Sequence, residues 1–184
     1  GPAHAAPVAR QLPELPEANI IVEPAPRGSA PAIALATALV ARHDPDAIVG
    51  SFAADHEVAD GAAFNRAIET AIVAAQQGWL VTVGLEPTRP ETGYGYIQRG
   101  APLSSGDGAY ALSRFVEKPD RETAQAYLDQ GDYLWNSGIF VMKASIWLSA
   151  LSMCRPDILD ACTTSLQAVS QDGDFVRVDR TAFE

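Results

Sequence analysis

Phe115-Val116-Glu117-Lys118-Pro119-Asp120 marks the point where a strand-like segment meets the start of a helix. Residues 109–116 are predicted to form a strand, which Pro119 ends because proline lacks a backbone N–H and has a fixed φ. Neighbouring side chains on a strand point to opposite faces. Glu117 and Lys118 can therefore face one ligand only if the backbone bends, and Pro119 favours a bend. The alternative is an exposed salt bridge at a strand end, which is a common arrangement.

The residues before this stretch predict a hairpin. Residues 87–97 read as a loop that runs into a strand, and Gly106-Asp107-Gly108 supplies a turn back towards 109–116. Gly93 and Gly95 lie in the loop, and glycine lets the backbone approach another group closely. We therefore expect an antiparallel excursion that ends at Glu117 and Lys118.

Strand and helix signals alternate in the first half of the chain. Ser29 and Asp60 are good N-cap residues, and each precedes an apolar pattern at helical spacing. Alternation with short connections is typical of a parallel α/β sheet. The expected elements are strands at 19–22, 46–54 and 80–85, a helix at 30–42, and a helix that begins after Asp60 and ends at Gly78.

Similar signals continue to the end of the chain. Asp120 is expected to cap a helix over 121–130, which Gly131 ends. Asn136-Ser137-Gly138 is expected to form a polar turn before a strand at 139–142. The expected helices that follow are 146–153 and a stretch from Pro156 to about residue 169. The whole pattern predicts an α/β, Rossmann-like fold with a mixed, mostly parallel sheet flanked by helices.

Composition excludes several classes of protein. The 184 residues suffice for one domain with a core. A net charge of −10 argues against nucleic-acid binding, which needs a basic face, and the apolar runs are too short for a membrane span. Cys154 and Cys162 show no metal-site spacing and are expected to be reduced thiols, which together with the lack of a signal-peptide pattern favours a cytoplasmic protein.

Two segments carry candidate ligands. Asp55 follows a predicted strand, where ligands bind in open α/β sheets, and could hold Mg²⁺; the alternative is a turn aspartate. The adjacent His56 lacks a nucleophile partner in the sequence. The loop from Glu23 to Ser29 connects a strand to a helix N-terminus, whose free N–H groups attract anions or ring carbonyls; a plain connection is the alternative.

Five stretches, in order, resemble the mannose-1-phosphate guanylyltransferases among the sugar-phosphate nucleotidyltransferases. Together they cover most of residues 19–140. Two departures stand out: the glycine-rich phosphate loop and first strand of the family are absent, and Gly28 stands where the family usually has Asn. The stretches are Glu23-Pro24 with Ser29-Ala30-Pro31-Ala32; Ala54-Asp55-His56; Pro87-Thr88-Arg89-Pro90-Glu91-Thr92-Gly93-Tyr94-Gly95-Tyr96-Ile97; Phe115 to Pro119; and Leu134-Trp135-Asn136-Ser137-Gly138.

The resemblance implies a Rossmann-like nucleotidyltransferase (GT-A-like) α/β fold. It also implies that residues 1–184 belong to a single catalytic domain that is incomplete at both ends, so that this segment alone is expected to be inactive. It implies attack of mannose 1-phosphate on GTP, which gives GDP-mannose and pyrophosphate, with Mg²⁺ as cofactor and a homodimer as a possible assembly. Asp55 (also the metal ligand) and Lys118 would be catalytic. Gly93, Tyr94, Glu117, Lys118 and Asn136 would bind the sugar phosphate, and Glu23, Gly28 and Ser29 would bind the nucleotide.

Two alternatives stay open at this point. One is the same reaction with another sugar phosphate or nucleotide, although the stretch 90–97 favours mannose. The other is a noncatalytic domain that binds a sugar nucleotide and regulates a partner, which the absent phosphate loop leaves possible.

Overall fold

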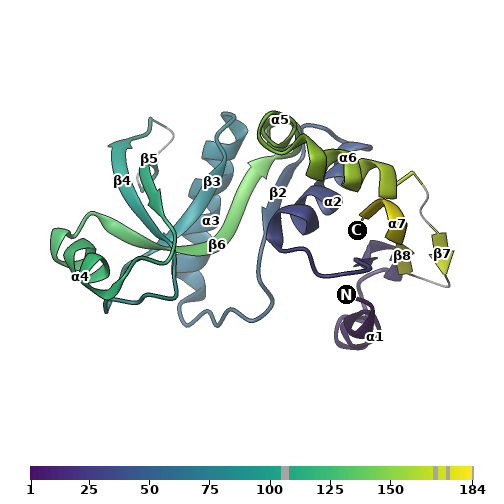
Figure 1. Cartoon of the computed structure of the whole chain (residues 1–184), viewed down its shortest axis with the longest axis horizontal. Helices are drawn as coiled ribbons and strands as arrows, with labels where there is room; N and C mark the ends of the chain where they lie inside the picture. The colour runs from purple at the N-terminus through teal and green to yellow at the C-terminus, as the bar shows by residue number, and fades with distance from the viewer. Residues whose placement is uncertain (105–107, 168–169, 173–174, 184) are drawn as a thin grey trace. The chain divides into compact units, whose positions relative to one another are not determined.

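A computed structural model describes residues 1–104, 108–167, 170–172 and 175–183 and divides the chain into two compact units. Unit 1 consists of Gly1–Ala47 and Ala144–Glu184, and unit 2 is Ile48–Lys143 (Figure 1). The described helices are all too short or too polar to cross a membrane. The expectation of a single catalytic domain over 1–184 stays a prediction.

Unit 1 is mainly helical. Its sheet has the order β1-β8-β7, with β1 parallel to β8 and β7 antiparallel to β8. The core lies between α2, α5 and α6, where Leu35, Leu151, Cys162 and Leu166 are buried. The elements are α1 (Pro2–Gln11), the 3-10 turn η1 (Glu17–Asn19), β1 (Ile21–Val22), α2 (Ser29–Ala41), α5 (Ala144–Cys154), α6 (Pro156–Ser165), β7 (Ser170–Asp172), β8 (Phe175–Arg177) and α7 (Arg180–Phe183).

The described residues of unit 2 form a five-stranded sheet and two helices. The expected caps are confirmed: Asp60 accepts from the Ala63 N–H at 2.9 Å, and Asp120 accepts from the Thr123 N–H at 2.8 Å. Gly131 ends α4 in the left-handed region, as expected. The elements are β2 (Ile48–Ser51), α3 (Gly61–Gln76), β3 (Val81–Leu85), β4 (Tyr96–Pro102), β5 (Tyr110–Val116), α4 (Arg121–Gln130) and β6 (Tyr133–Lys143).

The strand pairing corrects one expectation. Every pairing described for the five-stranded sheet is antiparallel, so the expectation of a mostly parallel sheet is wrong. Val141 of β6 lies opposite both Gly50 of β2 and Val81 of β3, so these two strands occupy the two edges of β6. They run in the same direction, as strand-helix alternation predicts, but β6 lies between them. The alternation of strands and helices in the sequence thus predicted the direction of β2 and β3 correctly, but it did not predict which strands are neighbours in the sheet.

The hairpin before Glu117 is confirmed, because β4 and β5 pair antiparallel from Tyr96 and Val116 onward. Most of its expected turn, residues 106–107, lies outside the described residues. Two local expectations are wrong. The helix α2 begins at Ser29 with Gly28 as its N-cap and no side-chain cap, and β2 ends at Ser51 instead of residue 54.

Candidate substrate site

Three positions meet on neighbouring strands of unit 2. Tyr96 of β4 lies opposite the last residue of β5 on one side and opposite Trp135 of β6 on the other. Gly95, the residue directly before β4, therefore lies between Glu117, the residue directly after β5, and Asn136 of β6. Two contacts agree: the Asn136 N–H donates to the Gly95 carbonyl at 2.8 Å, and a Cβ on Gly95 would lie 2.9 Å from Glu117 Oε2. We call Glu117, Gly95 and Asn136 the Gly95 row.

The absent side chain of Gly95 leaves room in this row. Side chains at one register on neighbouring strands project from the same face, so Glu117 and Asn136 flank an empty Cβ position. Two strand spacings separate their backbones, roughly 10 Å. The ring of Phe115 borders the same space, 3.0 Å from where that Cβ would lie. The row thus offers a carboxylate and an amide on either side of a gap with an aromatic border.

The opposite face of these strands is packed against α4. Tyr96 and Trp135 alternate with Gly95 and Asn136 along their strands, so they point the other way. They are buried in a cluster with Ala124, Tyr127 and Tyr133, and the rings of Tyr127 and Tyr133 stack with centroids 3.9 Å apart. This packed layer holds the Gly95 row in place from behind.

The backbone bends at Lys118, directly after the row. Its φ is 45°, and it is the one non-glycine residue with a positive φ in the described part of the chain. Such a conformation costs roughly 1 kcal/mol or more. The bend brings Lys118 Nζ to 3.5 Å from Glu117 Oε1, so the expected bend is confirmed, one residue before Pro119. Both side chains are more than half exposed, so the pair adds little stability and stays open to a ligand.

Glu91 organises the loop that precedes β4. Its carboxylate accepts from the Gly93 N–H at 3.1 Å and from the Arg89 guanidinium at 3.2 Å, while its carbonyl accepts from the Tyr96 hydroxyl at 2.9 Å. The bond from Gly93, followed by the bond from Arg89, lowers the pKa of Glu91. Arg89 also lies over the ring of Trp135, 5.4 Å from its centroid. The loop is therefore tied to β4 and β6.

Tyr94 and Gly93 lie at the exposed end of this loop. The Tyr94 ring meets Trp135 edge to face, with centroids 5.3 Å apart, and stays 45% exposed. A Cβ on Gly93 would have Glu91 Oε1 at 3.4 Å as its nearest neighbour, so the Gly93 backbone faces open space. The Gly93 backbone is thus open beside the Gly95 row, whereas the Tyr94 ring packs on Trp135, which belongs to the opposite face of these strands.

Asn136 lies inside β6, so the expectation of a turn over 136–138 is wrong. The strand runs from Tyr133 to Lys143 because β3 and β4 pair with its two edges. The turn-forming residues instead produce an irregularity: the register with β3 shifts between Thr82 and Gly84, and Gly138 has a φ of 74°.

Asp55 lies in an exposed turn, four residues after the end of β2. The described residues contain no cluster of three or more His, Cys, Asp or Glu that could hold a metal ion. Mg²⁺ does not require a complete set of protein ligands, because it is commonly held by one or two carboxylates together with substrate phosphates and water. One exposed carboxylate fits that donor set.

The predicted nucleotide residues lie in unit 1, between β1 and α2. Glu23 Oε1 is buried and has no hydrogen-bond partner among the described residues. Burial of the Cys162 thiol, together with the smaller effect of the nearby Glu23 charge, raises the pKa of Cys162 to about 11. Gly28 has φ 87° and ψ −175°, a combination that only glycine adopts readily. It caps α2 without a side chain, which leaves the N–H groups of Ser29 and its neighbours without a side-chain cap.

Comparison with known proteins identifies the family. The model of the nucleotidyl transferase family matches residues 2–180. The chain belongs to this family. The predicted nucleotidyltransferase α/β fold is thereby confirmed, and solved structures agree with it. One is a Thermus thermophilus protein described as a mannose-1-phosphate geranyltransferase, with a TM-score of 0.71 and 29% identity over 88% of this chain and 54% of that chain. Another is a mannose-6-phosphate isomerase from Helicobacter pylori, with a TM-score of 0.75 and 28% identity over 88% and 61% of the two chains.

Two curated relatives of this nucleotidyl transferase carry the same activity in their names. The mannose-1-phosphate guanylyltransferase of Escherichia coli K12 is 51% identical over 179 residues, which cover 95% of this chain and 37% of the relative. The mannose-1-phosphate guanylyltransferase ManC of Salmonella typhimurium LT2 is 49% identical over 178 residues, with the same coverage. The chain thus spans somewhat over a third of the length of these relatives.

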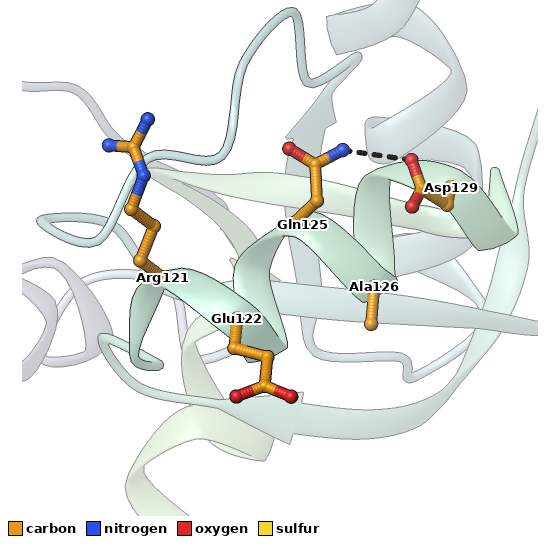
Figure 2. Close-up of a pocket in the computed structure, with 5 residues that line it drawn as sticks. All are labelled: Arg121, Glu122, Gln125, Ala126 and Asp129. Carbon is orange, nitrogen blue, oxygen red and sulfur yellow. Dashed lines mark hydrogen bonds between the residues drawn. The ribbon is translucent and has the colours of Figure 1, made fainter.

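A hollow on the outer face of α4 holds none of the predicted site residues of this nucleotidyl transferase. Figure 2 shows its side chains, which all come from α4, and the bond from Gln125 Nε2 to Asp129 Oδ1 at 2.8 Å. Since Ala124 and Tyr127 face the sheet, this is the solvated side of the helix. The lining residues are Arg121, Glu122, Gln125, Ala126 and Asp129.

Sequence reasoning missed two contributors to the site. Gly95 was expected only to permit close approach, and no local signal in the sequence shows that Glu117 and Asn136 lie beside it. Thr82 was not singled out. No sequence signal identifies it, because its contact with Asn136 joins residues 54 positions apart.

Proposed function

We propose that this chain supplies the sugar-phosphate and guanine sites of a mannose-1-phosphate guanylyltransferase. In the reaction a phosphate oxygen of mannose 1-phosphate forms a bond to the α-phosphorus of GTP. The bond between that phosphorus and the oxygen that bridges it to the β-phosphate breaks, and this oxygen leaves with pyrophosphate. The products are GDP-mannose and pyrophosphate. The names of relatives about half identical to the chain support this activity.

The Gly95 row is the observation that carries the proposal. Glu117 offers carboxylate oxygens that accept bonds from sugar hydroxyls, and Asn136 offers an amide from the other side of the gap. A Cβ at Gly95 would fill the space between them. Gly93 would offer its backbone to the same ligand, and the exposed part of the Tyr94 ring, which packs on Trp135, would contribute only at the border of the site. The row therefore recognises a compact molecule with several hydroxyl groups.

Lys118 would meet the phosphate of the sugar. The Lys118 ammonium is a point charge next to the Glu117 carboxylate. The bend at Lys118 therefore presents, side by side, a carboxylate that accepts from sugar hydroxyls and an ammonium that pairs with the phosphate. Positioning and charge neutralisation supply most of the catalysis in phosphoryl transfer. Asp55 would hold Mg²⁺, which when bound offsets negative charge on the phosphates.

Glu23 would select the guanine base. A buried carboxylate oxygen without a partner is costly, and guanine carries N1–H and 2-amino donors that could satisfy it. Adenine lacks this pair of donors. The backbone N–H groups at Gly28, Ser29 and the start of α2 could donate to the guanine carbonyl oxygen.

The location of the protein and its assembly are separate from the chemistry. We propose a cytoplasmic location because Cys154 and Cys162 are both free thiols, as is usual where disulfides are kept reduced. The homodimer stays a prediction.

Product analysis tests the proposal. The complete enzyme that contains residues 1–184 is incubated with Mg²⁺, GTP and mannose 1-phosphate, and GDP-mannose and pyrophosphate are quantified; parallel reactions contain ATP or glucose 1-phosphate. We expect one pyrophosphate per GDP-mannose and a preference for the first pair of substrates. A preference for glucose 1-phosphate would assign the same chemistry to another sugar. Binding of sugar nucleotide without any product would favour a noncatalytic domain.

A further inference from the structure

The orientation of the Asn136 side chain is set by contacts outside the proposed sugar contacts. The Thr82 hydroxyl on β3 lies 2.7 Å from Asn136 Oδ1, and the Gly138 N–H donates to the same oxygen at 3.4 Å. The main chain is also anchored, because the Asn136 N–H donates to the Gly95 carbonyl at 2.8 Å. The amide oxygen is thus held by two donors from the protein.

These contacts decide which end of the amide faces a ligand. If the amide rotated by half a turn, its NH₂ group would face the Gly138 N–H, and two donors would meet. The Thr82 hydroxyl has one hydrogen, and its other acceptor, the Ile139 carbonyl, is farther away at 3.2 Å. The shorter contact to Asn136 Oδ1 is therefore where we place this hydrogen. The amide NH₂ has no hydrogen-bond partner within the described residues, so it is the end left for a ligand.

We propose that Thr82 is a positioning residue that fixes Asn136 as a hydrogen-bond donor towards the sugar. This inference rests on the proposed function, because it concerns the same site. Without the Thr82 hydroxyl, the amide oxygen keeps only the long contact to Gly138, and the amide can turn an acceptor towards the ligand. A hydroxyl group can donate or accept, but a fixed donor selects one arrangement of the hydroxyls on the ring.

The test compares Thr82→Val, which keeps the branched shape, with Thr82→Ser, which keeps the hydroxyl. Thr82→Val should raise the KM and the calorimetric Kd for mannose 1-phosphate about 5- to 10-fold, the effect of losing one ordinary hydrogen bond. The KM for GTP should stay the same, and Thr82→Ser should stay within about twofold of the wild type. Thr70→Val is the matched control, because the partner of the Thr70 hydroxyl among the described residues is the Arg66 carbonyl within α3.

A double-mutant cycle separates positioning from general loss of packing. In an Asn136→Ala background, Thr82→Val should cause no further change in Kd, since the group it orients is gone. An equal effect of Thr82→Val in both backgrounds would overturn the inference, as would wild-type affinity in Thr82→Val. If Asn136→Ala alone left mannose 1-phosphate binding unchanged, the proposed function of the row would fail. If Asn136→Ala weakened binding and Thr82→Val did not, only the role of Thr82 would fail.

Discussion

Replacing Gly95 by alanine tests the geometry of the site with one methyl group. The new Cβ would lie 2.9 Å from Glu117 Oε2 and 3.0 Å from the Phe115 ring. Carbon atoms in contact normally lie about 3.5–4.0 Å apart, so the carboxylate and ring must move by roughly 0.5 Å or more. Both are the ends of side chains about half exposed, and the φ of Gly95 is not positive. We therefore expect the free energy of unfolding to change by less than about 1 kcal/mol.

Binding of the sugar should respond much more strongly. Displacing the Glu117 carboxylate weakens a charged hydrogen bond worth roughly 1.5–3 kcal/mol, which corresponds to a 10- to 100-fold rise in Kd. Calorimetric titration of Gly95→Ala with mannose 1-phosphate measures this change, and thermal unfolding measures stability. Wild-type affinity in a folded Gly95→Ala protein would refute the assignment of the row.

Two other glycines of unit 2 provide matched controls. A Cβ on Gly61, the first residue of α3, would meet nothing within 4 Å, so Gly61→Ala should leave binding and stability almost unchanged. A Cβ on Gly100 would lie 2.9 Å from the Ala111 carbonyl, which belongs to the backbone and cannot move aside cheaply. Gly100→Ala should therefore lower stability while the affinity of the folded protein is kept.

Three further predictions concern charged residues. In the complete enzyme that contains residues 1–184, Asp55→Asn should leave the fold intact but raise the Mg²⁺ concentration needed for half-maximal turnover about tenfold or more, because an amide offsets less metal charge; unchanged Mg²⁺ dependence would make Asp55 a turn residue. In the same complete enzyme, Lys118→Met should lower kcat as well as sugar affinity, whereas Glu117→Gln should mainly raise the KM for mannose 1-phosphate; a rise confined to the KM for GTP would contradict both roles. The depressed pKa of Glu91 means that its contribution to loop order is complete above the usual glutamate pKa and is lost as the pH falls through its lower value. In an NMR titration of the Glu91 carboxyl carbon, Arg89→Ala should move the midpoint upward, and an unchanged midpoint would show that Arg89 has no influence.

The sequence predicted best what depends on local chemistry. The limits of α4 follow from Asp120 and Gly131, and the start of α3 follows from Asp60, because caps satisfy backbone groups within a few residues. The bend at Glu117-Lys118 was expected for a similar reason, although the strain lies at Lys118 itself.

What depends on strand pairing was not predictable in the same way. Asn136-Ser137-Gly138 has the composition of a turn, and only the pairing of β6 with strands on both edges keeps these residues in a strand. The same pairing places β6 between two strands that strand-helix alternation would make neighbours. Gly95 acquires its role because Glu117 and Asn136 come beside it from strands that are distant in the sequence.

Titration of mannose 1-phosphate into the ¹⁵N-labelled protein tests the central claim most directly. The claim predicts shifts of the Gly93, Gly95 and Asn136 amide signals that saturate together with one Kd, and loss of these shifts in Glu117→Gln at the same ligand concentration. Glucose 1-phosphate at equal concentration should produce smaller shifts. Saturating shifts confined to other residues, with these three amides unmoved, would contradict the claim that the Gly95 row binds the sugar.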